Sequence, residues 1–254
     1  MTSPDATTRF SDRVENYVRY RPGYPPEILD LLRTRCGLIP QAHIVDIGFG
    51  TGLFTRLLLE NGNPVTGIEP NEEMRRAGEK FLAKFPRFRA VQGTAEASML
   101  GDHTADLVTA AQAAHWFDRE KARREFQRIL KPDGWMVLLW NERMTDSTPF
   151  LAAYEHLLLR YGTDYAEVRH ERTTEIIGEF FAPSSYELES FPMRQTFDLA
   201  SLEGRVFSSS YTPRPGEPNY KPLKGELGKL FRHCQSDGRV AFEYRTLVFF
   251  GRLP

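Results

Sequence analysis

Hydrophobic positions follow two alternating periods over the first 140 residues. From Pro26 to Trp140, stretches with a helical period of apolar residues alternate with short runs that are apolar on both faces. Alternating helices and fully buried strands build a parallel sheet with helices on both sides. The pattern predicts helices at residues 26–36, 53–61, 72–85 and 119–130, and strands at 43–47, 65–68, 87–91, 105–110 and 135–140. Residues 131–134, Lys-Pro-Asp-Gly, predict a turn before the last of these strands.

The pattern changes after Asn141. Helical periodicity at residues 148–160, 199–208 and 221–234 predicts a mainly helical cap over residues 143–235, with a strand near 187–197. Residues 240–253 alternate in hydrophobicity and predict a second strand, which pairs with the first as an antiparallel pair at the edge of the sheet. We therefore expect residues 1–254 to form one α/β domain, in which the cap is an insertion.

Composition and charge exclude several classes of function. The chain of 254 residues is 41% hydrophobic and 26% charged, as in an ordinary folded protein. Its 33 basic and 34 acidic residues give a net charge of −1, so we expect no nucleic-acid or membrane partner. Cys36 and Cys234 provide no disulfide framework, the histidines have no metal-ligand spacing, and no apolar run spans a membrane. These features predict a cytoplasmic protein without a metal. We expect a monomer or a homodimer, and the sequence does not decide between them.

A glycine-rich turn carries the clearest chemical signal. The first buried strand reaches Asp46 and is followed by Gly48, Gly50 and Gly52 before a helix. Glycines allow a tight turn and a close approach to a ligand, and the helix start presents free N–H groups. A nicotinamide dinucleotide site would have the spacing G-x-G-x-x-G, but Leu53 stands where its third glycine would be. The turn therefore indicates a nucleotide-type ligand other than NAD.

A carboxylate follows the next strand. Glu69 and Pro70 lie 23 and 24 residues beyond Asp46, at the carboxyl end of the strand beside the glycine turn. A carboxylate there can accept hydrogen bonds from both ribose hydroxyls. Helix capping is the alternative, because Asn71 is a natural N-cap and the charge of Glu69 favours a helix start.

These residues resemble those of the class I S-adenosylmethionine-dependent methyltransferases, and the resemblance covers residues 10–142. It implies a Rossmann-like, doubly wound and mostly parallel seven-stranded sheet with an antiparallel edge strand. It assigns the methionine portion of S-adenosylmethionine to Asp46 and the three turn glycines, and the ribose to Glu69 and Pro70. It places adenine recognition at Ala95 and Glu96; a plain loop is the alternative interpretation of this short polar segment.

The fourth strand ends in a cluster of polar and aromatic residues, Gln112, His115, Trp116 and Phe117. Ligands of open parallel sheets bind at this edge, and the resemblance places Gln112 and Trp116 beside the cofactor. An aromatic face also favours a positively charged sulfonium. His115 is a candidate general base for an acceptor hydroxyl or amine, and a packed loop histidine is the alternative.

The N-terminal segment also carries candidates. Residues 10–29 resemble the start of a type 11-like subgroup that includes small-acid methyltransferases of the trans-aconitate type, in which this segment lies over the cofactor. The resemblance makes Phe10, Tyr17, Arg21 and Tyr24 candidates, with Arg21 pairing the cofactor's carboxylate. The alternative is an amphipathic helix that ends at Pro22. In the cap, the hydroxyl-rich residues 208–213 either line an acceptor pocket or form a turn.

The sequence thus predicts methyl transfer from S-adenosylmethionine to an oxygen or nitrogen of a small-molecule acceptor by direct in-line displacement. Two alternatives remain: a regulatory protein that binds the cofactor without turnover, and a nicotinamide oxidoreductase on a similar sheet. The identity of the acceptor depends on the cap, whose residues one sequence does not order.

Overall fold

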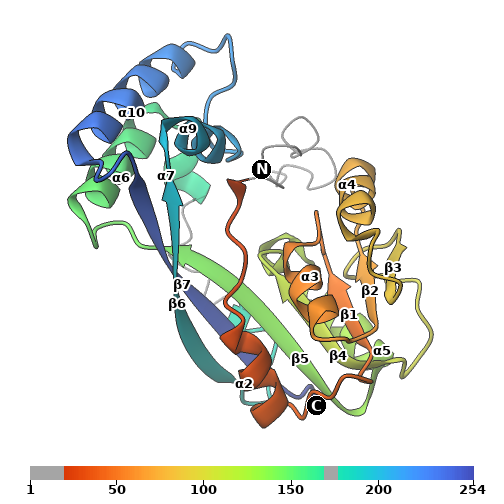
Figure 1. Cartoon of the computed structure of the whole chain (residues 1–254). Helices are drawn as coiled ribbons and strands as arrows, with labels where there is room; N and C mark the ends of the chain where they lie inside the picture. The colour runs from red at the N-terminus through yellow and green to blue at the C-terminus, as the bar shows by residue number, and fades with distance from the viewer. Residues whose placement is uncertain (1–19, 169–176) are drawn as a thin grey trace.

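A computed structural model describes residues 20–168 and 177–254 of the chain. Its centre is a seven-stranded sheet with the order β3-β2-β1-β4-β5-β7-β6 (Figure 1). The strands in this order are Phe88–Val91, Val65–Ile68, Ile44–Ile47, Ala105–Ala111, Leu130–Arg143, Val240–Gly251 and Glu187–Phe197. Neighbouring strands are parallel except at β7, which is antiparallel to both β5 and β6. The predicted doubly wound α/β fold, with an antiparallel pair at one edge, is confirmed.

Helices cover both faces of the parallel part because its strands are apolar on both sides. Four helices alternate with these strands, namely α2 (Glu27–Arg35), α3 (Leu53–Glu60), α4 (Glu72–Leu82) and α5 (Arg119–Ile129). Leu138 packs in one hydrophobic cluster with Phe126 of α5, whereas the next residue, Leu139, packs in another with Leu32 of α2. Successive strand residues therefore serve opposite layers, as the uninterrupted apolar runs predicted.

One predicted turn lies inside a longer strand. Strand β5 begins at Leu130, directly after α5, and residues 131–134 lie within it. Ala105 of β4 pairs with Leu130, but Leu107 pairs with Trp135, so the intervening residues form an irregularity in one continuous strand. The strand start predicted at Trp135 was wrong, because Leu130 already pairs with Ala105, but residues 131–134 have no pairing partner in β4 and bulge from the ladder, with Gly134 folded back toward the Lys131 carbonyl.

The cap has its own hydrophobic core at the far end of β6 and β7 (Figure 1). It contains α6 (Pro149–Tyr161), α7 (Tyr165–Val168), α9 (Leu199–Phe207) and α10 (Tyr220–Cys234). Strand β7 serves both regions, since Phe242 and Tyr244 pack in the cap while Val248 and Phe250 pack in the sheet core. Two long strands therefore join the cap to the sheet directly.

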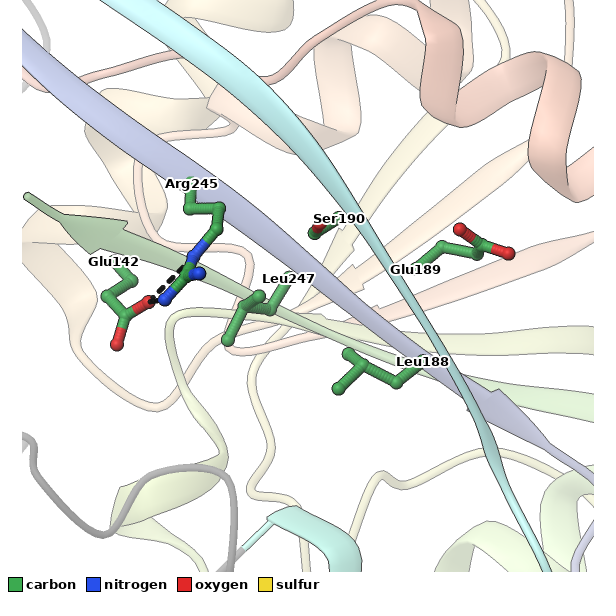
Figure 2. A pocket seen from close by; sticks show the side chains of 6 residues that line it. All are labelled: Glu142, Leu188, Glu189, Ser190, Arg245 and Leu247. Atoms are coloured by element: carbon green, nitrogen blue, oxygen red, sulfur yellow. Dashed lines mark hydrogen bonds and ion pairs between the residues drawn. The ribbon is translucent and has the colours of Figure 1, made fainter.

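A shallow hollow of about 370 Å³ lies on β5, β6 and β7, lined by Glu142, Leu188, Glu189, Ser190, Arg245 and Leu247 (Figure 2). Its charged residues face water: Arg245 and Glu142 form an ion pair of 2.7 Å with side chains 53% and 40% exposed. Solvent-exposed pairs contribute little to binding or stability. Within the two described segments, no helix is long and apolar enough to cross a membrane.

Candidate functional site

The glycine turn follows β1 at the carboxyl edge of the sheet. Gly48, Gly50 and Gly52 have φ angles of +67°, +58° and +87°, and Gly52 is the N-cap of α3. A Cβ atom on Gly48 would lie 2.7 Å from the Cβ of Ala113, in addition to the strain of its positive φ. The turn therefore depends on glycine for both backbone conformation and close packing against the loop after β4.

Asp46 lies beneath this turn and is 1% exposed. Its carboxylate accepts hydrogen bonds from the hydroxyls of Thr55 (2.6 Å) and Thr109 (2.8 Å). Burial raises the pKa of Asp46 from 3.8 to about 6, although the two hydroxyls oppose this shift. Because both oxygens are engaged, Asp46 fixes β1, α3 and β4 relative to one another directly below the turn.

Glu69 joins the end of β2 to the glycine turn. Its carboxylate accepts a hydrogen bond from the backbone N–H of Gly50 at 3.0 Å and another from that of Asn71 at 2.9 Å. The side chain is 8% exposed, and burial raises its pKa above the ordinary value, with the two backbone N–H groups opposing the shift. Asn71 caps α4 through Met74 N–H at 2.9 Å, so the helix has a cap of its own.

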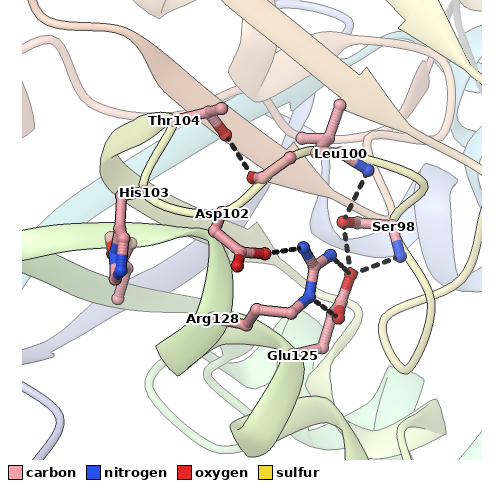
Figure 3. Close-up of polar contacts among 9 residues, drawn as sticks. Ser98, Leu100, Asp102, His103, Thr104, Glu125 and Arg128 are labelled. Atoms are coloured by element: carbon pink, nitrogen blue, oxygen red, sulfur yellow. Dashed lines mark hydrogen bonds and ion pairs between the residues drawn. The ribbon is translucent and has the colours of Figure 1, made fainter.

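The loop after β3 is fixed to α5. Ala95 is 4% exposed, and the Glu96 carboxylate accepts from the Asp118 N–H at 2.9 Å. Farther along, Glu125 accepts from the Ser98 N–H at 2.8 Å and also binds Arg128 (Figure 3). These contacts position the expected adenine-recognition pair by linking its loop to the helix that follows the fourth strand.

The end of β4 has a strained backbone. Gln112 has a φ of +58°, which is uncommon outside glycine, and its side-chain N–H donates to the Asn141 carbonyl at 3.1 Å. Its Oε1 is buried and has no hydrogen-bond partner among the described residues. A short 3₁₀ helix, Ala114–Trp116, follows and exposes His115, whose ring centroid lies 4.6 Å from that of Trp116.

The N-terminal segment contacts the cap. Arg21 donates to the carbonyl of Ser208 at the end of α9 at 3.2 Å, and the Tyr24 ring meets that of Phe54 at 5.0 Å. Arg21 thus has a cap carbonyl as its observed partner, while its predicted pairing with the cofactor's carboxylate stays a prediction. Phe10 and Tyr17 lie outside the described residues.

The sequence analysis did not identify three residues near the candidate site. Asn141 donates to the Gly23 carbonyl at 3.0 Å and accepts from the Thr246 hydroxyl at 2.6 Å, which ties β5 to the N-terminal segment and β7. Phe49 fills a space where Gly67 and Gly78 have no side chain. Thr51 is 1% exposed, and its hydroxyl has no partner among the described residues. In the sequence, only the polar Asn141 at the end of an apolar strand could have indicated one of these roles.

Comparison with known proteins decides the family. Residues 45–138 match the methyltransferase domain family. An uncharacterized methyltransferase of Schizosaccharomyces pombe is 33% identical over 244 residues, which cover 94% of this chain and 95% of the relative. The chain belongs to the S-adenosylmethionine-dependent methyltransferases. Its cofactor is therefore S-adenosylmethionine, in place of a nicotinamide.

Other relatives match the methyltransferase over different lengths. An uncharacterized methyltransferase of Mycobacterium tuberculosis is 39% identical over 141 residues, or 55% of this chain and 54% of the relative. A solved structure assigned to a type II methyltransferase of Anaeromyxobacter dehalogenans has a TM-score of 0.68 at 21% identity, covering 92% of this chain and 99% of that one. The YcgJ protein of Bacillus subtilis has a TM-score of 0.54 at 21% identity, covering 88% and 96%. Both structures support the fold.

The residues at the carboxyl edge fit this cofactor. The three glycines of the turn place no side chain between the backbone and a ligand, and Glu69 supplies acceptors beside them. The buried Thr51 hydroxyl has no partner in residues 20–168 and 177–254. A ligand with an amino acid and a ribose offers the donors and acceptors that these groups lack.

Proposed function

We propose that the methyltransferase acts on an oxygen or nitrogen of a small-molecule acceptor by direct in-line displacement. The observation that supports this most is the hydrogen bond between Gly50 N–H and Glu69, which brings the glycine turn and the acidic residue together at one sheet edge. When bound, S-adenosylmethionine supplies a methyl group on a positively charged sulfur. The protein's part is then to hold two reactants in line and to exclude water.

Each candidate residue takes a place in this proposal. Cofactor contacts come from the turn glycines, Glu69, Pro70, Ala95, Glu96, Gln112 and Trp116, together with Phe10, Tyr17 and Arg21. Asp46 acts indirectly, because its two oxygens hold Thr55 and Thr109 under the turn. In this proposal residues 10–142 bind the cofactor and residues 143–235 select the acceptor. The trans-aconitate type of acceptor rests on the N-terminal resemblance alone.

His115 is the proposed general base. It is exposed at the sheet edge beside Trp116 and Trp140, with ring centroids 4.6 and 5.1 Å away. An imidazole there can remove a proton from an acceptor hydroxyl or amine. We expect His115→Asn to lower kcat about 10²-fold or more while the Kd for S-adenosylhomocysteine is unchanged. Equal kcat in the two proteins would remove His115 from the mechanism.

Calorimetry followed by an acceptor screen tests the proposal. The purified chain is titrated with S-adenosylmethionine, S-adenosylhomocysteine and, as the control nucleotide, NADH. Transfer of a labelled methyl group is then measured over small molecules with hydroxyl or amino groups, and over RNA and protein. Binding of the first two ligands with transfer to a small molecule supports the proposal, whereas transfer to a macromolecule alone would contradict it.

A further inference from the structure

Arg205 is a buried cation that pairs with no carboxylate of the described residues. It belongs to α9 and is 4% exposed. Its Nε donates to the Tyr244 hydroxyl at 3.3 Å and its Nη1 to the Ser209 hydroxyl at 3.1 Å, both neutral groups. Among the residues that the structure describes, no carboxylate forms an ion pair or hydrogen bond with Arg205. An isolated buried charge is costly, so this position requires a compensating anion.

A second arginine lies close by but has its own partner. Arg143, at the end of β5, donates to Glu155 at 2.5 Å and to the Tyr165 hydroxyl at 2.9 Å. The Arg143 and Glu155 side chains are only 10% and 16% exposed. Because Glu155 offsets Arg143, it leaves the charge of Arg205 in excess.

Tyr154 lies between the two arginines. Its ring packs 4.9 Å from the Arg143 guanidinium, and both Arg143 and Arg205 are near enough to act on its pKa, which burial nevertheless raises. The residue is 1% exposed, and its hydroxyl has no partner within the described part of the chain. A buried donor without an acceptor points to a ligand that provides one.

The pKa of Tyr211 responds to the positive charges of the arginines near it. Burial raises its pKa, but Arg205, Arg21 and Arg143 outweigh that effect and lower it overall. Tyr211 also stands in the hydroxyl-rich segment 208–213 that the sequence marked as a candidate acceptor lining. The lowered pKa is the response expected of a phenol that faces several guanidinium groups.

The cluster continues from the cofactor edge of the sheet. Gln112 at the end of β4 binds the carbonyl of Asn141, and Arg143 follows two residues later on the same strand. The Asn141 side chain holds Gly23, two residues from Arg21, which itself reaches α9. The cluster therefore lies on the cap side of the edge that carries the glycine turn.

We propose that Arg205 and the Tyr154 hydroxyl form a binding site for an oxyanion, the carboxylate or phosphate group of a small-molecule acceptor, next to the Arg143–Glu155 pair. The guanidinium of Arg205 supplies the charge and directional N–H donors, and Tyr154 supplies a further donor. That the oxyanion belongs to the acceptor rests on the proposed function. The binding site itself can be tested without turnover.

The test compares malonate and inorganic phosphate with chloride at matched ionic strength and pH. Thermal unfolding and calorimetric titration are measured for the wild type, Arg205→Met and the control Arg245→Met, which removes an arginine from the exposed surface of β7. We expect malonate or phosphate to raise Tm in the wild type and the control, and the Kd of Arg205→Met to be at least about 30-fold weaker. Response to malonate alone identifies a carboxylate, and response to phosphate alone a phosphate. Equal effects of all three anions, or a wild-type response in Arg205→Met, would overturn the proposal.

Two further measurements separate this site from folding and from the cofactor. Tyr154→Phe removes a hydroxyl that makes no hydrogen bond with any described residue, so it should leave Tm unchanged and weaken anion binding about tenfold. An unchanged anion Kd in this variant would count against the site even if Arg205→Met failed to fold. S-adenosylhomocysteine should bind Arg205→Met as tightly as the wild type. A wild type that binds malonate or phosphate but no S-adenosylhomocysteine would refute the proposed function and leave the anion site standing.

Discussion

Glu69→Gln is the sharpest probe of the cofactor site. Glutamine keeps the length of the side chain but replaces one carboxylate oxygen with an NH₂ group and removes the charge. In the structure both oxygens accept from backbone N–H groups, those of Gly50 and Asn71. A charge-assisted hydrogen bond contributes about 1.5–3 kcal/mol, so losing one from the cofactor weakens binding about ten- to a hundredfold. Loss of a second such bond multiplies the effect.

Calorimetric titration with S-adenosylhomocysteine measures this change, and Glu72→Gln is the matched control. Glu72 is three residues away in the first turn of α4, its side chain is 59% exposed, and its partner is Arg76. We expect the control to bind within about twofold of the wild type, because exposed ion pairs contribute little.

Acidity should have the same effect as the substitution. Burial raises the pKa of Glu69, so this carboxylate takes up a proton at a higher pH than an ordinary glutamate. Wild-type affinity should therefore fall as the pH is lowered through that pKa, while Glu69→Gln lacks this contribution. Equal Kd values for the wild type and Glu69→Gln at neutral pH would refute the assignment of the ribose to Glu69.

Three predictions concern the support of the site. Burial raises the pKa of Asp46 from 3.8 to about 6. The raised pKa therefore contributes stability below about pH 4, and this contribution is lost as the pH rises through about 6. Urea unfolding should show this loss in the wild type but not in Asp46→Asn. Gly48→Ala should lower the free energy of unfolding by about 1–3 kcal/mol, because of the positive φ of Gly48 and the 2.7 Å contact of a new Cβ. Gly225→Ala, in a helix with open space around it, should raise the free energy of unfolding by about 0.4–1 kcal/mol. A higher Tm for Gly48→Ala than for Gly225→Ala would contradict this prediction. Glu125→Ala should lower the free energy of unfolding by about 1–3 kcal/mol because it leaves a buried N–H of the loop after β3 unpaired, and a loss no greater than that of the exposed Glu120→Ala would show that the contact is dispensable.

Local sequence signals were sufficient for the parallel half of the sheet. Buried strands such as Ile44–Ile47 are apolar on both faces, and Asn71 combines a capping side chain with a following acidic turn. Each of these signals acts over a few residues, so a single sequence displays it fully. The spacing from Asp46 to Glu69 predicted the position of this carboxylate beside the glycine turn for the same reason, since a strand, a turn and a helix have predictable lengths.

Long-range contacts were beyond the sequence. Strand β5 starts at Leu130, before the turn-forming residues 131–134, because Leu130 pairs with Ala105 of β4. Asn141 gains its role from Gly23 and Thr246, which are 118 and 105 residues away in the chain. Nothing in the local pattern around Arg205 distinguishes a buried guanidinium from one on a solvated helix face.

The proposed cofactor groups and the proposed acceptor groups also differ in whether local or long-range contacts position them. The groups proposed to hold the cofactor come from turns next to their own strands, so their geometry is set locally and supported by Asp46 from below. The groups proposed to hold the acceptor, Tyr154 and Arg205, come from α6 and α9 and converge only when the cap packs on β7. Arg21 donates to Ser208 and so connects the N-terminal segment to this second set. A change in cap packing can therefore alter the acceptor without altering the cofactor, and Arg205→Met, which leaves the glycine turn intact, is the substitution that separates these two properties.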